Sequence, residues 1–318
     1  MLISKLCIQL LLSVQATFAS SGDRLPEFND CVSQCVANRC PSSVGLLALL
    51  AWDCPSNCDY VCQQALTDVH EEHHMRVHQY HGKWPFRRWF GVQEIASVVF
   101  SLLNMVPHFI GYRALQKQTR DSEQFRMRSY YLSFAVVGVN TWVWSSVFHL
   151  RDLPVTEKLD YFSAIGSILG GLFLAIVRFY RLDMPAKRPT RNIVFVTIVG
   201  FYACHIFYLS FIKFNYAYNM MAGVVVGVAQ VCLWIVLSMS LYVRSKNKMD
   251  LLPIGLVLSV FLGLSFELND FSPYWRTVDA HSLWHASTVL PSFFWYKWMI
   301  FDLNRHTHPH RYEMHQYK

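Results

Sequence analysis

The chain has 318 residues, of which 53% are hydrophobic and only 15% are charged. Soluble domains carry about a quarter charged residues, so this composition excludes an ordinary soluble enzyme and is typical of a protein that crosses a membrane several times. The net charge of +7 does not indicate nucleic-acid binding, because its meaning depends on the side of the membrane on which each cation lies. We expect an all-α, membrane-embedded protein that binds no nucleic acid.

Residues 1–19 have the pattern of a secretory signal peptide. Lys5 supplies the positive start, the stretch from Leu6 to Val14 is apolar, and Thr17-Phe18-Ala19 has the small-x-small form of a cleavage site. A short uncleaved anchor is the alternative, which the small residues disfavour. The pattern predicts that the chain from residue 20 onward begins in the lumen of the secretory pathway.

Six of the nine cysteines lie in one short segment after the signal peptide. An even number in an oxidising compartment predicts three disulfides, and the sequence leaves all fifteen pairings open. Several spacings of four residues suit two short helices that are stapled together. A zinc cluster is the alternative, disfavoured because no Cys-x-x-Cys is present. The six cysteines are Cys31, Cys35, Cys40, Cys54, Cys58 and Cys62.

Residues 20–91 are therefore expected to form a cysteine-rich lumenal domain. The apolar stretch from Leu46 to Trp52 is too short to span a membrane and is expected to be its small core. His70, His74 and His78 recur at helical spacing, which predicts a solvated helix face and leaves a pH-sensing or metal role open. The basic and aromatic segment from His81 to Trp89 is typical of a lipid headgroup surface.

Seven apolar runs follow, each long enough to cross a bilayer as a helix. They predict a seven-transmembrane helix bundle over residues 92–302 and a tail over 303–318. We place the runs at 92–112, 128–149, 159–180, 192–212, 217–243, 251–268 and 282–302.

The connecting segments alternate in charge. Segments after the first, third and fifth runs are rich in arginine and lysine, as is the tail, and the intervening segments are poor in them. Cytosolic segments carry the excess of positive charge. The pattern therefore predicts a lumenal N-terminus and a cytosolic C-terminus, in agreement with the signal peptide.

The seventh run opens with His281-Ser-Leu-Trp-His285. Histidines four residues apart lie on one face of a helix, a common way to present two nitrogens to one metal ion. The predicted topology places His149, at the end of the second run, and Asp160, near the start of the third, at the same lumenal depth. Three imidazoles and an open position are typical of catalytic zinc, so we expect His149, His281 and His285 to bind Zn²⁺.

Two further residues are candidates for the chemistry. Zinc lowers the pKa of a bound water toward about 7, and Asp160 could accept that water's proton or orient a ligand. Ser145, one turn before His149, could donate to a developing oxyanion. Alternatives stay open: His149 as an interfacial polar residue, Asp160 as a helix cap, Ser145 as a helix contact. Glu94 and Glu267 lie near the same face, and we assign them no role.

The combination of Ser145-x-x-x-His149, Asp160 and His281-x-x-x-His285 in seven spans resembles the CREST superfamily of membrane hydrolases. The signal peptide, the cysteine-rich head and the junction His81-Gly-Lys-Trp-Pro-Phe86 are similar to the post-GPI-attachment-to-proteins factor 3 family. The resemblance covers essentially the whole mature chain. It implies that the three histidines are zinc ligands and that Asp160 and Ser145 complete a catalytic site.

The resemblance also implies a substrate and a compartment. It suggests a GPI-specific phospholipase A2 of the Golgi membrane, with the endoplasmic reticulum as second choice, that removes the unsaturated sn-2 acyl chain from GPI-anchored proteins. The site residues alone do not separate ester from amide hydrolysis, so a ceramidase-like amidase stays open. A metal-stabilised receptor or scaffold without turnover is the other alternative.

Overall fold

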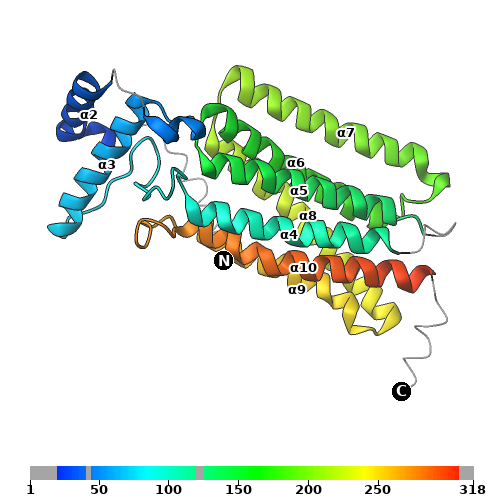
Figure 1. Ribbon diagram of the computed structural model, residues 1–318. Coiled ribbons are helices and arrows are strands. Elements are labelled where there is room, and N and C mark those ends of the chain that lie inside the picture. Colours follow the sequence, from blue (N-terminus) through cyan, green and yellow to red (C-terminus); the bar gives the residue numbers. More distant parts are fainter. Residues whose placement is uncertain (1–19, 41–43, 119–124, 308–318) are drawn as a thin grey trace, which may run out of the picture.

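The computed structural model describes residues 20–40, 44–118 and 125–307. The predicted signal peptide lies outside the described residues, as does most of the predicted tail. A small helical head sits at one end of a bundle of long helices (Figure 1). We call the bundle end next to it the head end. Within the described residues there are isolated β-bridges and no strands.

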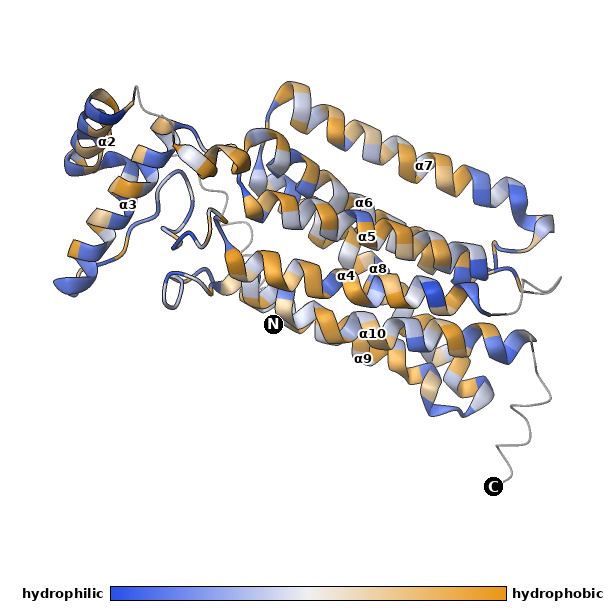
Figure 2. Ribbon diagram, viewed as in Figure 1, coloured by the Kyte–Doolittle hydropathy of each residue, from blue (hydrophilic) through white to orange (hydrophobic). Residues whose placement is uncertain are grey.

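In the described part of the chain the bundle consists of seven α-helices. They run back and forth between the head end and the opposite, far end (Figure 1). Their residues are apolar along most of their length, whereas hydrophilic residues gather in the head and at helix ends (Figure 2). The helices are α4 (Ile95–Gln116), α5 (Arg128–Leu150), α6 (Pro154–Tyr180), α7 (Arg188–Phe207), α8 (Tyr216–Ser245), α9 (Leu252–Leu268) and α10 (Ala280–Thr307).

Six segments of the described chain are long and apolar enough to cross a membrane, one fewer than predicted. The predicted seventh run corresponds to α10, whose 28 residues would span about 42 Å at 1.5 Å per residue. Its length suits a span, but Lys297, Asp302 and Arg305 dilute its hydropathy. The prediction of an all-α membrane bundle with a disulfide-linked head is confirmed.

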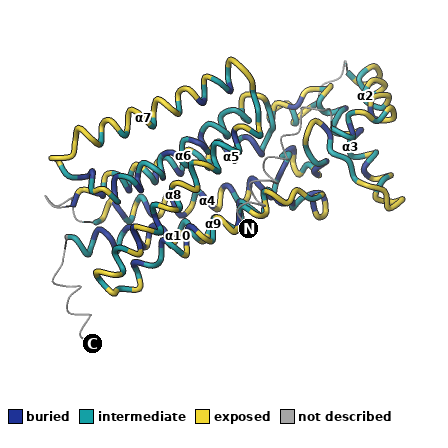
Figure 3. Tube along the Cα trace, turned by 180° about the vertical axis from the view of Figure 1, so that it is seen from behind, coloured by how far each residue is buried: buried dark blue, intermediate teal, exposed yellow. Residues whose placement is uncertain are grey.

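Packing between neighbouring helices defines the inside of the bundle. Helix α10 lies against α4 and α9, and α5 lies between α4 and α6. Helix α7 lies on the outside against α6, so most of its residues are exposed (Figure 3). The largest buried side chains of the far half, Trp234, Trp298 and Tyr131, form a continuous apolar core.

A buried ion pair closes the far end. The Arg178 guanidinium donates two hydrogen bonds to the Asp302 carboxylate, at 2.8 and 2.9 Å. Tyr131 and Arg305 donate to the same carboxylate, at 2.7 and 2.8 Å. Asp302 has no exposed surface, so its charge is compensated wholly by protein groups. The network joins α5, α6 and α10 at the end opposite the head.

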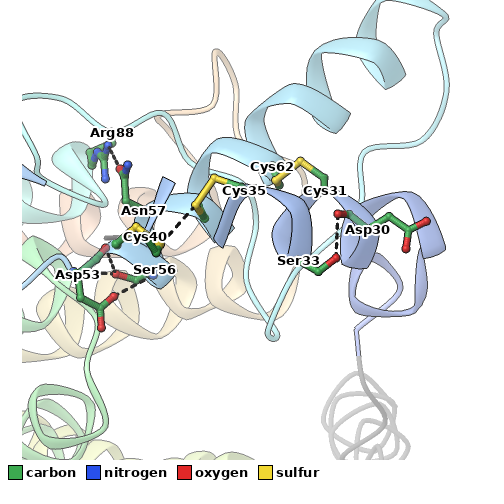
Figure 4. Close-up of a disulfide and its surroundings, with 12 residues drawn as sticks. Asp30, Cys31, Ser33, Cys35, Cys40, Asp53, Ser56, Asn57, Cys62 and Arg88 are labelled. Atoms are coloured by element: carbon green, nitrogen blue, oxygen red, sulfur yellow. Dashed lines mark hydrogen bonds between the residues drawn. A yellow bond between two sulfur atoms is a disulfide. The ribbon is translucent and has the colours of Figure 1, made fainter. Parts of the chain in front are cut away.

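Three disulfides hold the head together, as the cysteine count predicts (Figure 4). They connect helix α2 (Pro26–Arg39) and the segment after it to α3 (Cys54–Glu72). The pairing is nested, as expected for two antiparallel helices. Sulfurs in disulfides are not available as thiolate ligands, so the zinc-cluster alternative is excluded. The pairs are Cys31–Cys62, Cys35–Cys58 and Cys40–Cys54.

The predicted core of the head is wrong. The stretch Gly45–Leu50 forms the 3-10 helix η2 at the edge of the head, where Leu46 is 84% and Leu49 is 81% exposed. The disulfides, with Phe28 and Tyr80, already fill the space beside α3. Only Trp52 from the predicted stretch is buried, and its indole donates to the Gly91 carbonyl at 2.8 Å.

The predicted histidine face is also wrong. Helix α3 ends at Glu72, and His74 adopts the left-handed conformation with φ 53°, which terminates a helix. The chain then reverses, so His78 returns beside His70 with ring centroids 5.0 Å apart. Farther along, His81 contacts Asp59 on α3 at 2.9 Å. This hydrogen bond raises the pKa of His81 against the opposing effect of burial.

Candidate metal centre

Two helices bring the three predicted histidines together at the head end. His149 lies in the last turn of α5, and His281 and His285 lie in the first two turns of α10. Because α5 ends and α10 begins at the same end of the bundle, the side chains meet there. His149 and His285 are buried, whereas the His281 side chain is 34% exposed. The cluster therefore opens to its surroundings on the His281 side.

The spacing of the imidazole nitrogens fits a metal ion. His149 Nε2 lies 3.2 Å from His281 Nε2, and one nitrogen from each of the three rings lies within 4.8 Å of the others. Zinc–nitrogen bonds of 2.0–2.1 Å in a tetrahedron would separate two ligand nitrogens by about 3.4 Å. The three side chains could hold an ion with one position left for another ligand.

Each imidazole is held by its other nitrogen. His149 Nδ1 lies 2.7 Å from a Glu94 carboxylate oxygen, and His281 Nδ1 lies 2.6 Å from a Glu267 carboxylate oxygen. His285 Nδ1 lies 2.9 Å from the Ser101 hydroxyl. A carboxylate accepts the Nδ1 proton and leaves Nε2 as a lone-pair donor, which is the usual arrangement behind metal-binding histidines.

The two carboxylates belong to residues that lie near the site in the predicted topology but have no predicted role. Glu94 directly precedes α4, and its backbone N–H donates to the His149 carbonyl at 3.0 Å. Glu267 lies at the end of α9 and also accepts from the Tyr216 hydroxyl at 2.8 Å. Carboxylates at the ends of apolar runs are costly to bury. The presence of Glu94 and Glu267 at such ends could therefore have indicated that both belong to the site. Ser101 gave no signal, because serine is common between membrane helices.

Ser145 lies one layer behind the histidines. Its hydroxyl is 2.9 Å from the Ser101 hydroxyl, so Ser145, Ser101 and His285 form a buried chain of hydrogen bonds. Asn104 adds to this support by donating to the His285 carbonyl at 2.7 Å. The structure thus links Ser145 to His285 through the Ser101 hydroxyl.

Asp160 is a buried carboxylate without a partner. Helix α6 begins at Pro154, with Thr156 bonding the Leu153 N–H at 2.9 Å, so Asp160 lies in the second turn and does not cap the helix. Within the described residues its carboxylate accepts no hydrogen bond, while the charges of His281 and Glu94 act on it. A free acceptor within electrostatic reach of His281 is suited to taking a proton.

Comparison with known proteins gives consistent matches over most of the chain. Residues 45–303 match the family model described as the Per1-like family. The chain is 40% identical over 304 residues to the "Protein PER1 homolog" of Schizosaccharomyces pombe, covering 91% of this chain and 90% of that protein. It is 33% identical over 344 residues to "Protein PER1" of Saccharomyces cerevisiae, covering 93% and 94%. It is 35% identical over 291 residues to the "GPI-specific phospholipase A2-like PGAP3" of Mus musculus, covering 88% of each.

Proposed function

The chain belongs to the Per1-like family, and from this premise we propose that it is a zinc-dependent, GPI-specific phospholipase A2. It acts in GPI remodelling and removes the unsaturated sn-2 acyl chain from the lipid of GPI-anchored proteins. Relatives named "GPI-specific phospholipase A2-like PGAP3" support the reaction class and the substrate. The observation that carries the proposal is the convergence of His149, His281 and His285, each with its Nδ1 already bonded.

Each group around the centre has a separate role in ester hydrolysis. A zinc ion held by the three histidines would polarise the ester carbonyl and lower the pKa of a water molecule, so that this water can lose a proton and attack the carbonyl. Asp160 takes the proton of the attacking water. The same proton then passes to the sn-2 oxygen of glycerol as the acyl bond breaks. Ser101, with Ser145 behind it, holds His285 in place throughout. The products are a free fatty acid and a lysolipid.

The position of the centre suits a lipid substrate. It lies at the head end of the bundle, where the apolar helices meet the more hydrophilic head (Figure 2), and His281 is the most exposed of its three histidines. With the head in the lumen, the centre faces the leaflet in which GPI lipids lie. We place the chain in the Golgi membrane, with the endoplasmic reticulum as second choice, N-terminus lumenal and C-terminus cytosolic.

The direct test uses the full chain purified in lipid micelles and a GPI-anchored protein as substrate. We expect one zinc per chain by elemental analysis, and a free unsaturated fatty acid with a lyso-GPI product by mass spectrometry. Zinc-loaded protein that releases no fatty acid from the GPI substrate would contradict the proposal. Cleavage of ceramide instead would indicate an amidase.

The carboxylates behind the histidines should control metal affinity. Glu267→Gln or Glu94→Gln removes the charged acceptor for an Nδ1 proton, and loss of such a partner lowers metal affinity roughly 10–100-fold. Competition with a chelator of known affinity measures this. Glu157→Gln is the matched control, because Glu157 is an acid in the first turn of α6 that pairs with none of the three histidines in the described residues. Equal zinc affinity in all three variants would contradict the assigned role.

A further inference from the structure

The Lys83 ammonium lies at the head end of the bundle, beside the last turn of α5 that carries His149. Lys83 belongs to the segment that joins α3 to α4. Its Nζ is 4.2 Å from the centre of the Phe148 ring, and that ring is 4.9 Å from the ring of His149. The charge of Lys83 acts on Glu94, His149 and Asp160. The proposed function gives this cation no task.

The backbone holds Lys83 in a fixed place. Tyr80 and Lys83 exchange both backbone hydrogen bonds, at 2.8 and 2.9 Å. The two residues between them, His81 and Gly82, have φ of 51° and 80°, as a tight two-residue turn requires. The turn is tied to the head through His81. Lys83 therefore projects from a rigid support and not from a free loop.

Asp152, just beyond α5, orients the ammonium. Lys83 Nζ forms an ion pair with the Asp152 carboxylate, and both side chains are partly buried, 29% and 20% exposed. Gln93 accepts the Asp152 N–H at 3.1 Å and fixes the position of that residue. An ammonium has three donors, so Lys83 can keep Asp152 and still donate to an anion. Partial burial strengthens its interaction with such an anion.

We propose that Lys83 forms a subsite for the phosphodiester of the lipid whose sn-2 ester is cleaved at the histidine centre. The inference rests on the proposed function, which supplies the ester. In an inositol phospholipid the phosphate is attached to the glycerol carbon next to the one that bears the sn-2 ester. With the ester at the histidines and the acyl chains in the apolar bundle, the phosphate lies on the head side. Lysine binds phosphate there as a point charge.

The subsite makes the phosphate a determinant of specificity. A neutral diacyl lipid contains the same ester but has no phosphate that could accept a hydrogen bond from Lys83. Hydrogen bonds to charged groups contribute roughly 1.5–3 kcal/mol, which corresponds to a preference of about 10–150-fold for the phosphate-bearing lipid. The alternative is that Lys83 only fastens the head to the bundle, in which case its loss affects both lipids alike.

Binding of two non-hydrolysable lipids tests this without turnover. The probes are a diether phosphatidylinositol and a diether glycerol with the same chains, bound to the full chain in neutral micelles. Wild type and Lys83→Arg should prefer the phosphate-bearing probe about tenfold or more, and Lys83→Gln should lose the preference while its affinity for the neutral probe is unchanged. Lys158→Gln is the matched control, because Lys158 lies at the start of α6 beside Phe214, and it should keep the preference.

Two results would overturn the inference: a preference that persists in Lys83→Gln, or an equal loss of affinity for both probes. If Lys83→Gln does not fold, Lys83→Met, which keeps the aliphatic stem over Phe148, takes its place with the same expectation. The outcome is separate from that of the proposed function. A wild-type chain that binds the phosphate through Lys83 but releases no fatty acid retains the subsite and refutes the phospholipase. A chain that releases fatty acid but shows no phosphate preference that depends on Lys83 supports the phospholipase and refutes the subsite.

Discussion

Replacing His285 with alanine should lower fatty-acid release from a GPI substrate by on the order of a thousandfold and abolish stoichiometric zinc binding. The expected magnitude follows from the several kcal/mol of charge stabilisation that a metal contributes to the transition state, at a factor of ten for each 1.36 kcal/mol. His285 is buried. Once its ring is removed, the hydrogen bonds with Ser101 and Asn104 that position this residue no longer contribute to metal binding. Elemental analysis and product quantification on the purified variant measure both effects.

His205→Ala is the matched control. His205 is another buried bundle histidine, bonded to Asn219 at 3.1 Å and outside the candidate centre. It should keep one zinc per chain and fatty-acid release within a few-fold of wild type. Release that persisted in His285→Ala would refute the ligand assignment. Equal loss in both variants would show that the effect is on folding.

Asp302→Ala should lower the free energy of unfolding by about 3–5 kcal/mol, the usual effect of removing one partner of a buried ion pair. The Arg178 guanidinium is 3% exposed and donates two hydrogen bonds to the Asp302 carboxylate. Without the carboxylate its charge stays buried among apolar helices, and the Tyr131 hydroxyl loses its acceptor. Denaturant titration in mixed micelles measures the change.

The control for this variant is an arginine–aspartate pair in which the carboxylate is exposed to solvent. Asp68 lies 2.7 Å from Arg276 and is 65% exposed, so Asp68→Asn should change stability by about 0–1 kcal/mol. A loss below 1 kcal/mol in Asp302→Ala would show that water or another hydrogen-bond acceptor compensates the charge of Arg178. Zinc content should be unchanged in both variants, because the far-end pair and the head are each separate from the histidines.

Much of the architecture follows from local properties of the chain. In a bilayer every backbone polar group must be satisfied within the segment, so long apolar runs become helices. The run from Arg128 to Leu150 and the run that opens at His281 were predicted to within a few residues. Strict alternation of the helices then places the end of one beside the start of the other. The alternation of helix directions therefore predicts, from the sequence alone, that His149 lies near His281.

Long-range contacts between side chains could not be predicted from local properties of the chain. Leu46 and Leu49 were predicted to be core residues and are exposed, because the disulfides fill the space that they were expected to occupy. Glu267 and Glu94 reach their histidines from α9 and from the start of α4. Neither spacing nor hydropathy specifies which side chain a buried imidazole will meet.

The sequence by itself therefore determined the number of disulfides, the helical bundle and the end of the bundle at which the histidines lie, because each depends on composition or on a repeat within one segment. The tertiary structure decided the disulfide pairing, the Nδ1 partner of each imidazole and the contacts of Lys83 with Phe148 and Asp152. Those contacts join residues up to 184 positions apart, as in Ser101 and His285. They depend on how helices pack and which rotamers fit between them, and no local pattern in the chain encodes that.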